Sequence, residues 1–443
     1  MDTALDTEAS ARSVSVEILI DFDENKILDY SAANQLDTRG RAEVREYVQN
    51  ILRRRSYLDF LINEFSNVQI AEMKPILKNI LRLGIYDMIF MDSTPDYAAI
   101  NESVEIAKLK LGSRTGDLTN AIMRNLQRDM DNLPKPSFED RTKLVATTFS
   151  HPEWLVKRWT ARFGEREAFQ LMQANNQRPN YFVRANNLRT KTENFKLRMT
   201  KTDISFRESE WLPGYFEVES VAPFISKGWL DKGFCQIQDI AAGIAPFLLD
   251  PEPGEEIYDL CAAPGTKSIL MSDLMNAEGS ILAVDISSER LDMLARSALS
   301  YYAENIRVRR ADVTELTLEE ADGVLLDAPC TGTGVLSKRA DLRWRRNEEE
   351  LQKAVELQSK LLDSAAGMVK KGGRLVYSTC SLEEEENMNQ VMNFLDRHEN
   401  YELQSVEGYV PDEVMIDGGF GYQTFPHKHH CDGHFGVLLE RAS

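Results

Sequence analysis

Two cysteines in the C-terminal half of the chain have neighbours that suggest chemistry. Cys330 ends the motif Asp327-Ala-Pro-Cys330, and Cys380 lies in Ser378-Thr-Cys-Ser381. Each motif follows an apolar run typical of a buried strand. Because the carboxyl ends of parallel strands meet in one crevice, where ligands bind, we expect both thiols and the Asp327 carboxylate to converge.

Two thiols beside a carboxylate suit covalent catalysis on a pyrimidine. Carbon 5 of cytosine is a poor nucleophile, but a thiolate that adds to carbon 6 makes carbon 5 enamine-like and able to attack an electrophilic methyl group. The reaction also needs a group that stabilises charge at N3 and a base that removes the carbon-5 proton. The residues leave open how Cys380, Cys330 and Asp327 share these tasks.

The segment after Cys380 bears on its reactivity. Ser381-Leu-Glu-Glu384 resembles a capping box and predicts a helix start, whose free N–H groups would stabilise a thiolate. The acidic run 383–386 would oppose this effect.

A loop of small residues follows a third strand-like run, 256–260, and leads into a helix expected at 269–275. Such a loop lets a ligand approach the backbone, and the start of the helix supplies free N–H groups. Asp285 ends the next expected strand, about 20 residues after Gly265, where an acid can bind ribose hydroxyls. Asp312 suits an adenine amine.

The loop lacks the G-x-G-x-x-G pattern of dinucleotide-binding proteins, so S-adenosylmethionine is the cofactor that this arrangement favours. The candidate cofactor-binding residues are Cys261, Ala262, Ala263, Pro264, Gly265, Thr266, Lys267, Asp285, Asp312 and Asp327.

The N-terminal part is expected to be helical, because apolar residues recur there at helical spacing (Val14, Ile18, Leu19, Val48, Ile51, Leu52, Leu58). Three stretches, 74–90, 99–108 and 119–125, resemble the NusB-type RNA-binding fold. Two prolines in Asp129–Ser137 predict a linker. We therefore expect a multidomain chain: an all-α NusB-like domain at 1–130, a linker at 131–145, a small α+β RNA-binding module at 146–235 and a Rossmann-like α/β catalytic domain at 236–443.

The net charge of −19 argues against a nucleic-acid partner, but charge is distributed unevenly over the 443 residues. The segment 151–210 contains twelve Lys or Arg against seven Asp or Glu. A second basic cluster follows the Cys330 motif: Lys338, Arg339, Arg343, Arg345 and Arg346. Solvated helix faces explain either cluster alone equally well. Their position beside the candidate chemistry favours RNA contact.

Five scattered cysteines indicate reduced thiols rather than a disulfide framework, and for Cys235 and Cys261 inert packing is the expected role. The chain shows no signal-peptide pattern and no apolar stretch of membrane-spanning length. We expect a cytoplasmic monomer without a membrane partner.

Several motifs together give a resemblance to the RNA 5-methylcytosine methyltransferases, and the full arrangement resembles their bacterial small-subunit (16S) ribosomal RNA methyltransferase B family. The matching residues are Gln238-Asp239, Asp259–Lys267, Asp285, Asp312, Asp327–Gly334, Ser378–Ser381, Phe425-Pro-His427 and Asp432-Gly433.

This resemblance implies roles for the candidate residues. Cys380 would be the nucleophile, Cys330 would assist release of the methylated base, Asp327 would bind the cytosine, and Lys267 would be a further catalytic residue. The cofactor would be S-adenosylmethionine, and the partner would be small-subunit ribosomal RNA with an unpaired or extruded cytosine.

The chain departs from the family pattern in two places. Thr266 stands where the family loop has glycine, and a positive φ there would be costly for threonine and would weaken cofactor binding. The tail is rich in zinc-type ligands, namely His427, His429, His430, Cys431 and His434. Because the family motif at this place holds no metal, no metal site is expected.

Two alternatives remain, and a third is disfavoured. The same residues would methylate cytosine in transfer RNA, and a non-catalytic RNA-binding or ribosome-assembly protein could retain this fold. A small-molecule methyltransferase would not need the long helical and basic modules before the catalytic domain.

Overall fold

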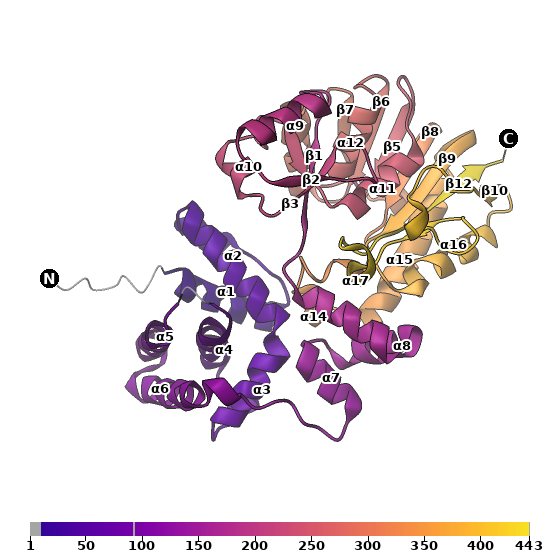
Figure 1. Ribbon diagram of the computed structural model, residues 1–443. Coiled ribbons are helices and arrows are strands. Elements are labelled where there is room, and N and C mark those ends of the chain that lie inside the picture. The colour runs from indigo at the N-terminus through magenta and orange to yellow at the C-terminus, as the bar shows by residue number, and fades with distance from the viewer. Residues whose placement is uncertain (1–9, 92–93, 443) are drawn as a thin grey trace. The chain divides into compact units, whose positions relative to one another are not determined.

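The computed structural model describes residues 10–91 and 94–442 (Figure 1). The chain forms two compact units. Unit 1 comprises Met1–Gln177 with Leu336–Asn347, and unit 2 comprises Arg178–Val335 with Glu348–Ser443. The finer division expected at 130, 145 and 235 remains a prediction.

Unit 1 is helical throughout its described part. Its helices are α1 (Ala11–Asn25), α2 (Thr38–Arg53), α3 (Arg55–Phe65), α4 (Pro75–Phe90), α5 (Asp96–Leu111), α6 (Ser113–Arg128), α7 (Arg141–Phe149), α8 (Glu153–Asn176) and α14 (Leu342–Arg345), with short 3-10 turns at Ser31–Gln35, Ile70–Glu72 and Met130–Asn132. All seven apolar residues used to predict the helical domain are buried in its core. This part of the fold prediction is confirmed.

The segment 336–347 enters unit 1 although the chain on both sides of it belongs to unit 2. Arg343 is fully buried and donates hydrogen bonds to the carbonyl oxygens of Arg53 (3.0 Å), Ser150 (3.1 Å) and Asn175 (2.7 Å). Trp344 Nε1 donates to the carbonyl of Leu52 at 2.7 Å. The expectation that Arg343 contacts RNA is therefore wrong, because its guanidinium is fully buried and its two Nη groups donate to acceptors within unit 1.

Unit 2 contains an antiparallel sheet in the order β2-β3-β1-β4. Its strands are β1 (Tyr181–Ala185), β2 (Phe206–Glu208), β3 (Tyr215–Val218) and β4 (Cys235–Ile237), packed with α9 (Thr192–Lys201) and α10 (Ala222–Ser226). Arg184 on β1 is buried and pairs with Asp273 at 3.0 Å, so it does not contribute to a basic surface. The basic stretch 151–210 is also divided between the two units at Gln177.

The second sheet of unit 2 has the order β10-β12-β9-β8-β5-β6-β7, with β11 paired to β12. The strands β5 to β9 pair in parallel, whereas β12 joins β9 antiparallel. The bounds are β5 (Glu256–Leu260), β6 (Ser280–Asp285), β7 (Ile306–Arg310), β8 (Ala321–Asp327), β9 (Val369–Thr379), β10 (Tyr401–Leu403), β11 (Tyr422–Gln423) and β12 (Phe435–Arg441).

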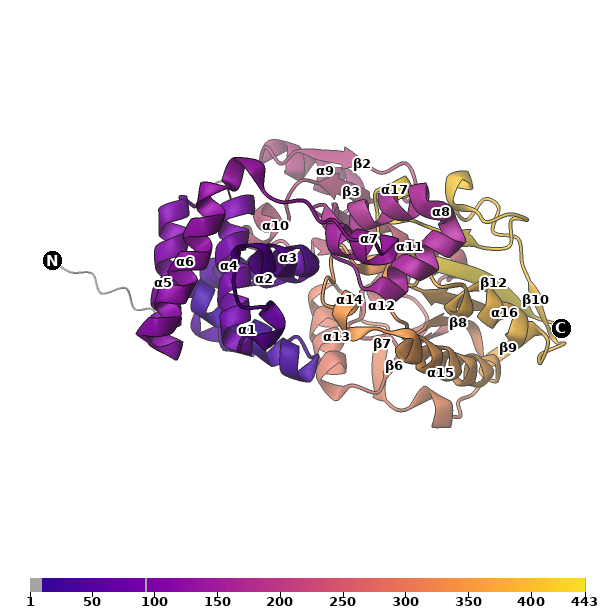
Figure 2. The ribbon, with the colours of Figure 1, turned by 90° about the horizontal axis from the view of Figure 1, so that it is seen from below.

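Successive strand residues point to opposite faces of this sheet, and apolar side chains lie on both faces. Helices therefore cover both faces. Leu325 and Val376 pack on the face of α11 (Ile240–Leu249) and α12 (Thr266–Leu274), which α13 (Ser288–Ser300) extends. Leu326 and Tyr377 pack on the face of α15 (Glu348–Ala366) and α16 (Met388–Leu395), seen beside β9 in Figure 2. Short turns at Val313–Glu315, Thr333–Val335, Glu384–Glu386 and Asp412–Val414 and a short helix, α17 (Pro426–His429), complete the unit.

Candidate active site

The strands β8 and β9 bring the two thiols together. Asp327 and Ser378 lie opposite each other in the parallel register, and Ser378 Oγ donates to Asp327 Oδ1 at 2.9 Å. The chain then continues from both strands into loops that place Cys330 Sγ 3.2 Å from Cys380 Sγ. The predicted convergence of the thiols and the carboxylate is confirmed.

Lys267, in the first turn of α12, completes this group. Its Nζ lies 2.5 Å from Asp327 Oδ2. Burial alone would raise the pKa of Asp327, but the Lys267 ammonium and His434 outweigh it, so the pKa lies below its ordinary value. The site therefore contains an ionised carboxylate beside two thiols.

Cys330 is held as a neutral thiol. The pKa of Cys330 lies well above its ordinary value. The hydrogen bond with Cys380 is the largest cause, and burial is the second. A protonated Cys330 can donate to the Cys380 sulfur. The two thiols are thus not equivalent in the resting protein.

Two further cysteines, Cys235 and Cys261, are held as neutral thiols by the same reasoning. Burial raises the pKa of Cys235 to about 12, and burial together with nearby carboxylates raises the pKa of Cys261. Neither thiol is therefore expected to ionise near neutral pH, and the inert role expected from the sequence stays a prediction.

The loop between β5 and α12 owes its shape to Gly265. Gly265 has a φ of 100°, and a Cβ there would lie 2.3 Å from Leu294 Cγ. Thr266 is instead the first residue of α12. The left-handed residues of this loop are Cys261 and Gly265, not Thr266, so the reason for expecting Thr266 to weaken cofactor binding does not hold.

Two acids lie at the same edge of the sheet as this loop. Asp285 ends β6 and accepts hydrogen bonds from the backbone N–H groups of Ala263 (3.0 Å) and Ser287 (2.9 Å). Asp312 follows β7, is exposed, and accepts from the N–H and hydroxyl of Thr314, which lower its pKa. Asp285 therefore fixes the loop through Ala263.

The helix expected directly after Cys380 is absent. Residues 381–383 are irregular, a 3-10 turn covers Glu384–Glu386, and α16 begins only at Met388. Ser381 Oγ accepts from the N–H of Glu383 at 3.0 Å instead of capping a helix. The capping-box interpretation is wrong because the side chain of Glu386 binds Ser381 and holds the segment in a loop.

Glu386 is the site residue that the sequence did not reveal. It was grouped with an acidic run, but its side chain is fully buried between the loops of Cys330 and Cys380. Its partners are Thr331, Ser381 and Gln358. The available signal was the run of hydroxyl residues in both cysteine motifs, which need an acceptor when buried.

The motifs of the C-terminal tail have structural partners. Asp239 Oδ1 caps α11 through Ala241 N and also accepts from Asp432 N at 3.2 Å. Gly433 N donates to the carbonyl of Gly334 at 2.8 Å, and a Cβ on Gly334 would lie 2.1 Å from Gly433 O. These contacts connect the tail to the loop that contains Cys330.

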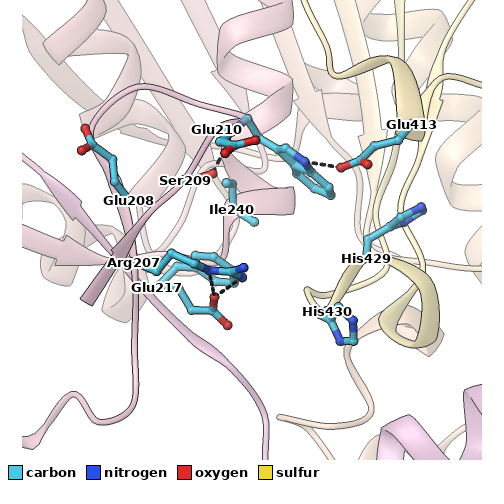
Figure 3. A pocket seen from close by; sticks show the side chains of 11 residues that line it. Arg207, Glu208, Ser209, Glu210, Glu217, Ile240, Glu413, His429 and His430 are labelled. Carbon is cyan, nitrogen blue, oxygen red and sulfur yellow. Dashed lines mark hydrogen bonds and ion pairs between the residues drawn. The ribbon is translucent and has the colours of Figure 1, made fainter. Parts of the chain in front are cut away.

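A cavity of about 310 Å³ lies elsewhere in unit 2 (Figure 3). Arg207 and Glu217, an ion pair from β2 and β3, line it opposite His429 and His430. No group of three or more potential ligands in the described part of the chain is arranged to hold a metal ion. Nor does any helix in that part have the length and apolarity to cross a membrane.

Family models match three parts of the chain. They are described as NusB family (residues 9–128), Methyltr_RsmF/B-like ferredoxin-like domain (151–223) and 16S rRNA methyltransferase RsmB/F (246–440). The two sheets and the N-terminal helices thus have family counterparts in the expected order.

Individual relatives agree. A probable ribosomal RNA small subunit methyltransferase B of Bacillus subtilis (strain 168) is 29% identical, covering 97% of this chain and 98% of its own. Its counterpart from Synechocystis sp. (strain PCC 6803) is 31% identical, covering 90% of each chain. The crystal structure of PH0851 has a TM-score of 0.81 at 25% identity, covering 98% of this chain and 99% of that one.

Fold and site together define a Rossmann-like methyltransferase joined to a NusB-like helical domain. More specifically, the chain belongs to the ribosomal RNA small subunit methyltransferase B family.

Proposed function

We propose that this protein transfers a methyl group from S-adenosylmethionine to carbon 5 of a cytosine in small-subunit ribosomal RNA, through a covalent adduct between Cys380 and carbon 6. One observation carries the proposal: the 3.2 Å separation of Cys330 Sγ and Cys380 Sγ beside the Asp327–Lys267 pair. Family membership supports the methyl transfer and the ribosomal RNA.

Asp327 and Lys267 suit recognition of the base. The ionised Asp327 can accept a hydrogen bond from the cytosine amine, and the Lys267 ammonium can stabilise negative charge that develops on the ring when sulfur adds to carbon 6. Cys380 forms the sulfur–carbon bond and leaves with that electron pair when the carbon-5 proton has been removed.

The hydrogen bond between the thiols gives Cys330 a role that changes during the reaction. In the resting protein this bond is the largest cause of the raised pKa of Cys330. Once Cys380 is bonded to carbon 6, its sulfur is an uncharged thioether and a weak acceptor. The pKa of Cys330 then falls, so a larger fraction of Cys330 is in the thiolate form, which can accept the carbon-5 proton when it must be removed.

The loop 261–267 and the acids at the strand ends fit S-adenosylmethionine. Asp285 and Asp312 offer carboxylate acceptors for ribose hydroxyls and for the adenine amine, and the start of α12 presents backbone N–H groups to the same edge. The bound cofactor would supply the electrophilic methyl group. These residues would orient it toward Cys380 and Cys330.

An extruded or unpaired cytosine is the form of substrate that such a site accepts. Carbon 6 of a stacked, paired base is not accessible to a side-chain sulfur, so the nucleotide must leave the stack. The NusB-like and ferredoxin-like parts would bind the surrounding RNA, and we expect a cytoplasmic monomer.

Bisulfite sequencing tests the substrate assignment. Small-subunit RNA from cells that lack this protein should lose one 5-methylcytosine and regain it with the wild-type gene. A loss confined to transfer RNA would support the transfer-RNA alternative. Unchanged methylation in both RNAs would leave the non-catalytic RNA-binding protein as the better account.

A further inference from the structure

We propose that Glu386 is the positioning residue that fixes the separation of the two thiols. Glu386 lies outside both cysteine motifs in the sequence. In the structure its carboxylate lies between the loops that contain Cys330 and Cys380. The expected effect on catalysis rests on the proposed function. The expected effect on the separation of the two thiols does not.

The two oxygens of Glu386 bind both loops. Oε1 accepts from the backbone N–H of Thr331 at 2.8 Å, and Oε2 accepts from the hydroxyl groups of Thr331 and Ser381. Thr331 follows Cys330 directly, and Ser381 follows Cys380 directly. One rigid carboxylate therefore links the residues next to each sulfur.

Gln358, on α15, braces the same group from the far side. Its Nε2 donates to Glu386 Oε1 at 3.0 Å and to the carbonyl of Pro329, also at 3.0 Å. Cys330 is thus held on both sides, through Pro329 and Thr331. The backbone of Glu386 is fixed as well, because its carbonyl accepts from Tyr377 Oη at 2.7 Å.

Such a network holds a distance well because the buried carboxylate of Glu386 binds residues of both loops at once. Glu386 is fully buried, and burial raises its pKa although hydrogen bonds from Ser381 and Thr331 oppose the change. A buried carboxylate is stable only while its hydrogen bonds are made, and loss of one member leaves the others unsatisfied. The loops cannot separate without breaking these bonds.

A glutamine at position 386 tests this role with little change in volume. Its amide can accept from only one side and presents N–H donors to the hydroxyl groups on the other, so the link between Thr331 and Ser381 weakens. The exposed neighbour Glu384 provides the matched control, Glu384→Gln.

The first readout measures the geometry without any methyl transfer. Each variant is treated with the thiol oxidant diamide, which converts two thiols to a disulfide as it is itself reduced to the hydrazine. Formation of the Cys330–Cys380 disulfide is followed by peptide mapping. We expect the rate to fall at least tenfold in Glu386→Gln and to stay within twofold of wild type in Glu384→Gln. An unchanged rate in folded Glu386→Gln would overturn the proposal.

The second readout measures the reaction. With Cys380 still able to attack but Cys330 displaced, kcat should fall at least tenfold while KM for S-adenosylmethionine stays within about twofold, and the covalent RNA adduct should accumulate. A structural role alone would lower the melting temperature and leave the disulfide rate and this kcat–KM split unchanged, which would contradict the proposal.

Thr331→Val is a second variant that tests the same role if Glu386→Gln does not fold. It removes one hydroxyl donor and retains the backbone N–H bond, so a smaller decrease in the disulfide rate is expected, and no decrease would count against the proposal. If the wild-type protein methylates no RNA but disulfide formation is still at least tenfold slower in Glu386→Gln, the proposed function fails while the positioning role of Glu386 stands.

Discussion

At the scale of single residues, the charges of Asp327 and Lys267 depend on each other. The ammonium is the main reason why the pKa of this buried carboxyl lies below its ordinary value. Replacing Lys267 with methionine should raise the pKa of Asp327, so the acidic limb of the kcat/KM–pH profile should move to higher pH. We also expect kcat/KM near neutral pH to fall by roughly 100-fold.

The comparison for this prediction is Asp327→Asn, in which no carboxyl remains to titrate. Its loss of activity should be independent of pH on the acidic side. An acidic limb that stays in place in Lys267→Met would show that Asp327 is not the group that titrates there.

Asp259 gives a pH dependence of stability. Burial is the largest cause that raises its pKa to about 7, while its hydrogen bond from Ser268 opposes the shift. The folded protein therefore holds a proton that the unfolded chain releases near pH 4, so this contribution to stability is present below that pH and is lost as the pH rises through about 7.

Asp259→Asn should remove this dependence because the amide stays neutral. Above about pH 8 the variant should be more stable than wild type by on the order of a few kcal/mol, and the difference should disappear near pH 4. Urea unfolding at both pH values measures it. A variant that is less stable at high pH would contradict the assignment of a neutral Asp259.

At the scale of elements, the loop from β5 to α12 separates two neighbouring positions. Gly265→Ala must place a side chain at positive φ and against Leu294, so the affinity for S-adenosylmethionine should fall at least tenfold. Thr266→Gly changes the first residue of a helix and should leave that affinity within about twofold. Calorimetric titration measures the affinity of both variants for S-adenosylmethionine. A higher affinity in Thr266→Gly would show that Thr266 does weaken cofactor binding.

Parallel strand ends were predictable from the sequence, whereas the loops beyond them were not. Apolar runs before Asp327 and Ser378 were enough to bring Cys330 and Cys380 together, because strand register then fixes what lies side by side. The segment after Cys380 was predicted wrongly as a helix. Its true conformation depends on Glu386 meeting Thr331, which is 55 residues away along the chain, and local spacing contains no trace of that contact.

The sequence also failed to predict which charged residues are buried. Arg343 belongs to a basic cluster in the sequence, but in the structure it lies among backbone carbonyls of unit 1. Charge counts register only residue type. Whether an arginine meets phosphate or protein depends on long-range packing, which the pattern 338–346 does not encode.

At the scale of the whole molecule, the segment 336–347 means that the chain passes from unit 2 into unit 1 and back. Arg343→Ala would leave several buried carbonyl groups without a donor, which should destabilise unit 1 by about 3 kcal/mol. Hydrogen exchange should show faster opening in α2 and α7. Arg343 binds the carbonyl of Arg53, the last residue of α2, and the carbonyl of Ser150, which directly follows α7.

Arg339→Ala is the control from the same cluster. Its side chain is 52% exposed and pairs with Asp341, so its removal should cost less than about 1 kcal/mol. Equal destabilisation by both variants would contradict the anchoring role of Arg343.

The central claim is that two thiols divide the covalent reaction between them. The most direct measurement follows transfer of labelled methyl from S-adenosylmethionine to unmodified small-subunit RNA and, in the same samples, the RNA that stays bound to protein after denaturation. We predict that Cys380→Ala gives neither methylation nor adduct, and that Cys330→Ala accumulates the adduct. Adduct formation in Cys380→Ala, or full turnover in Cys330→Ala, would contradict the account.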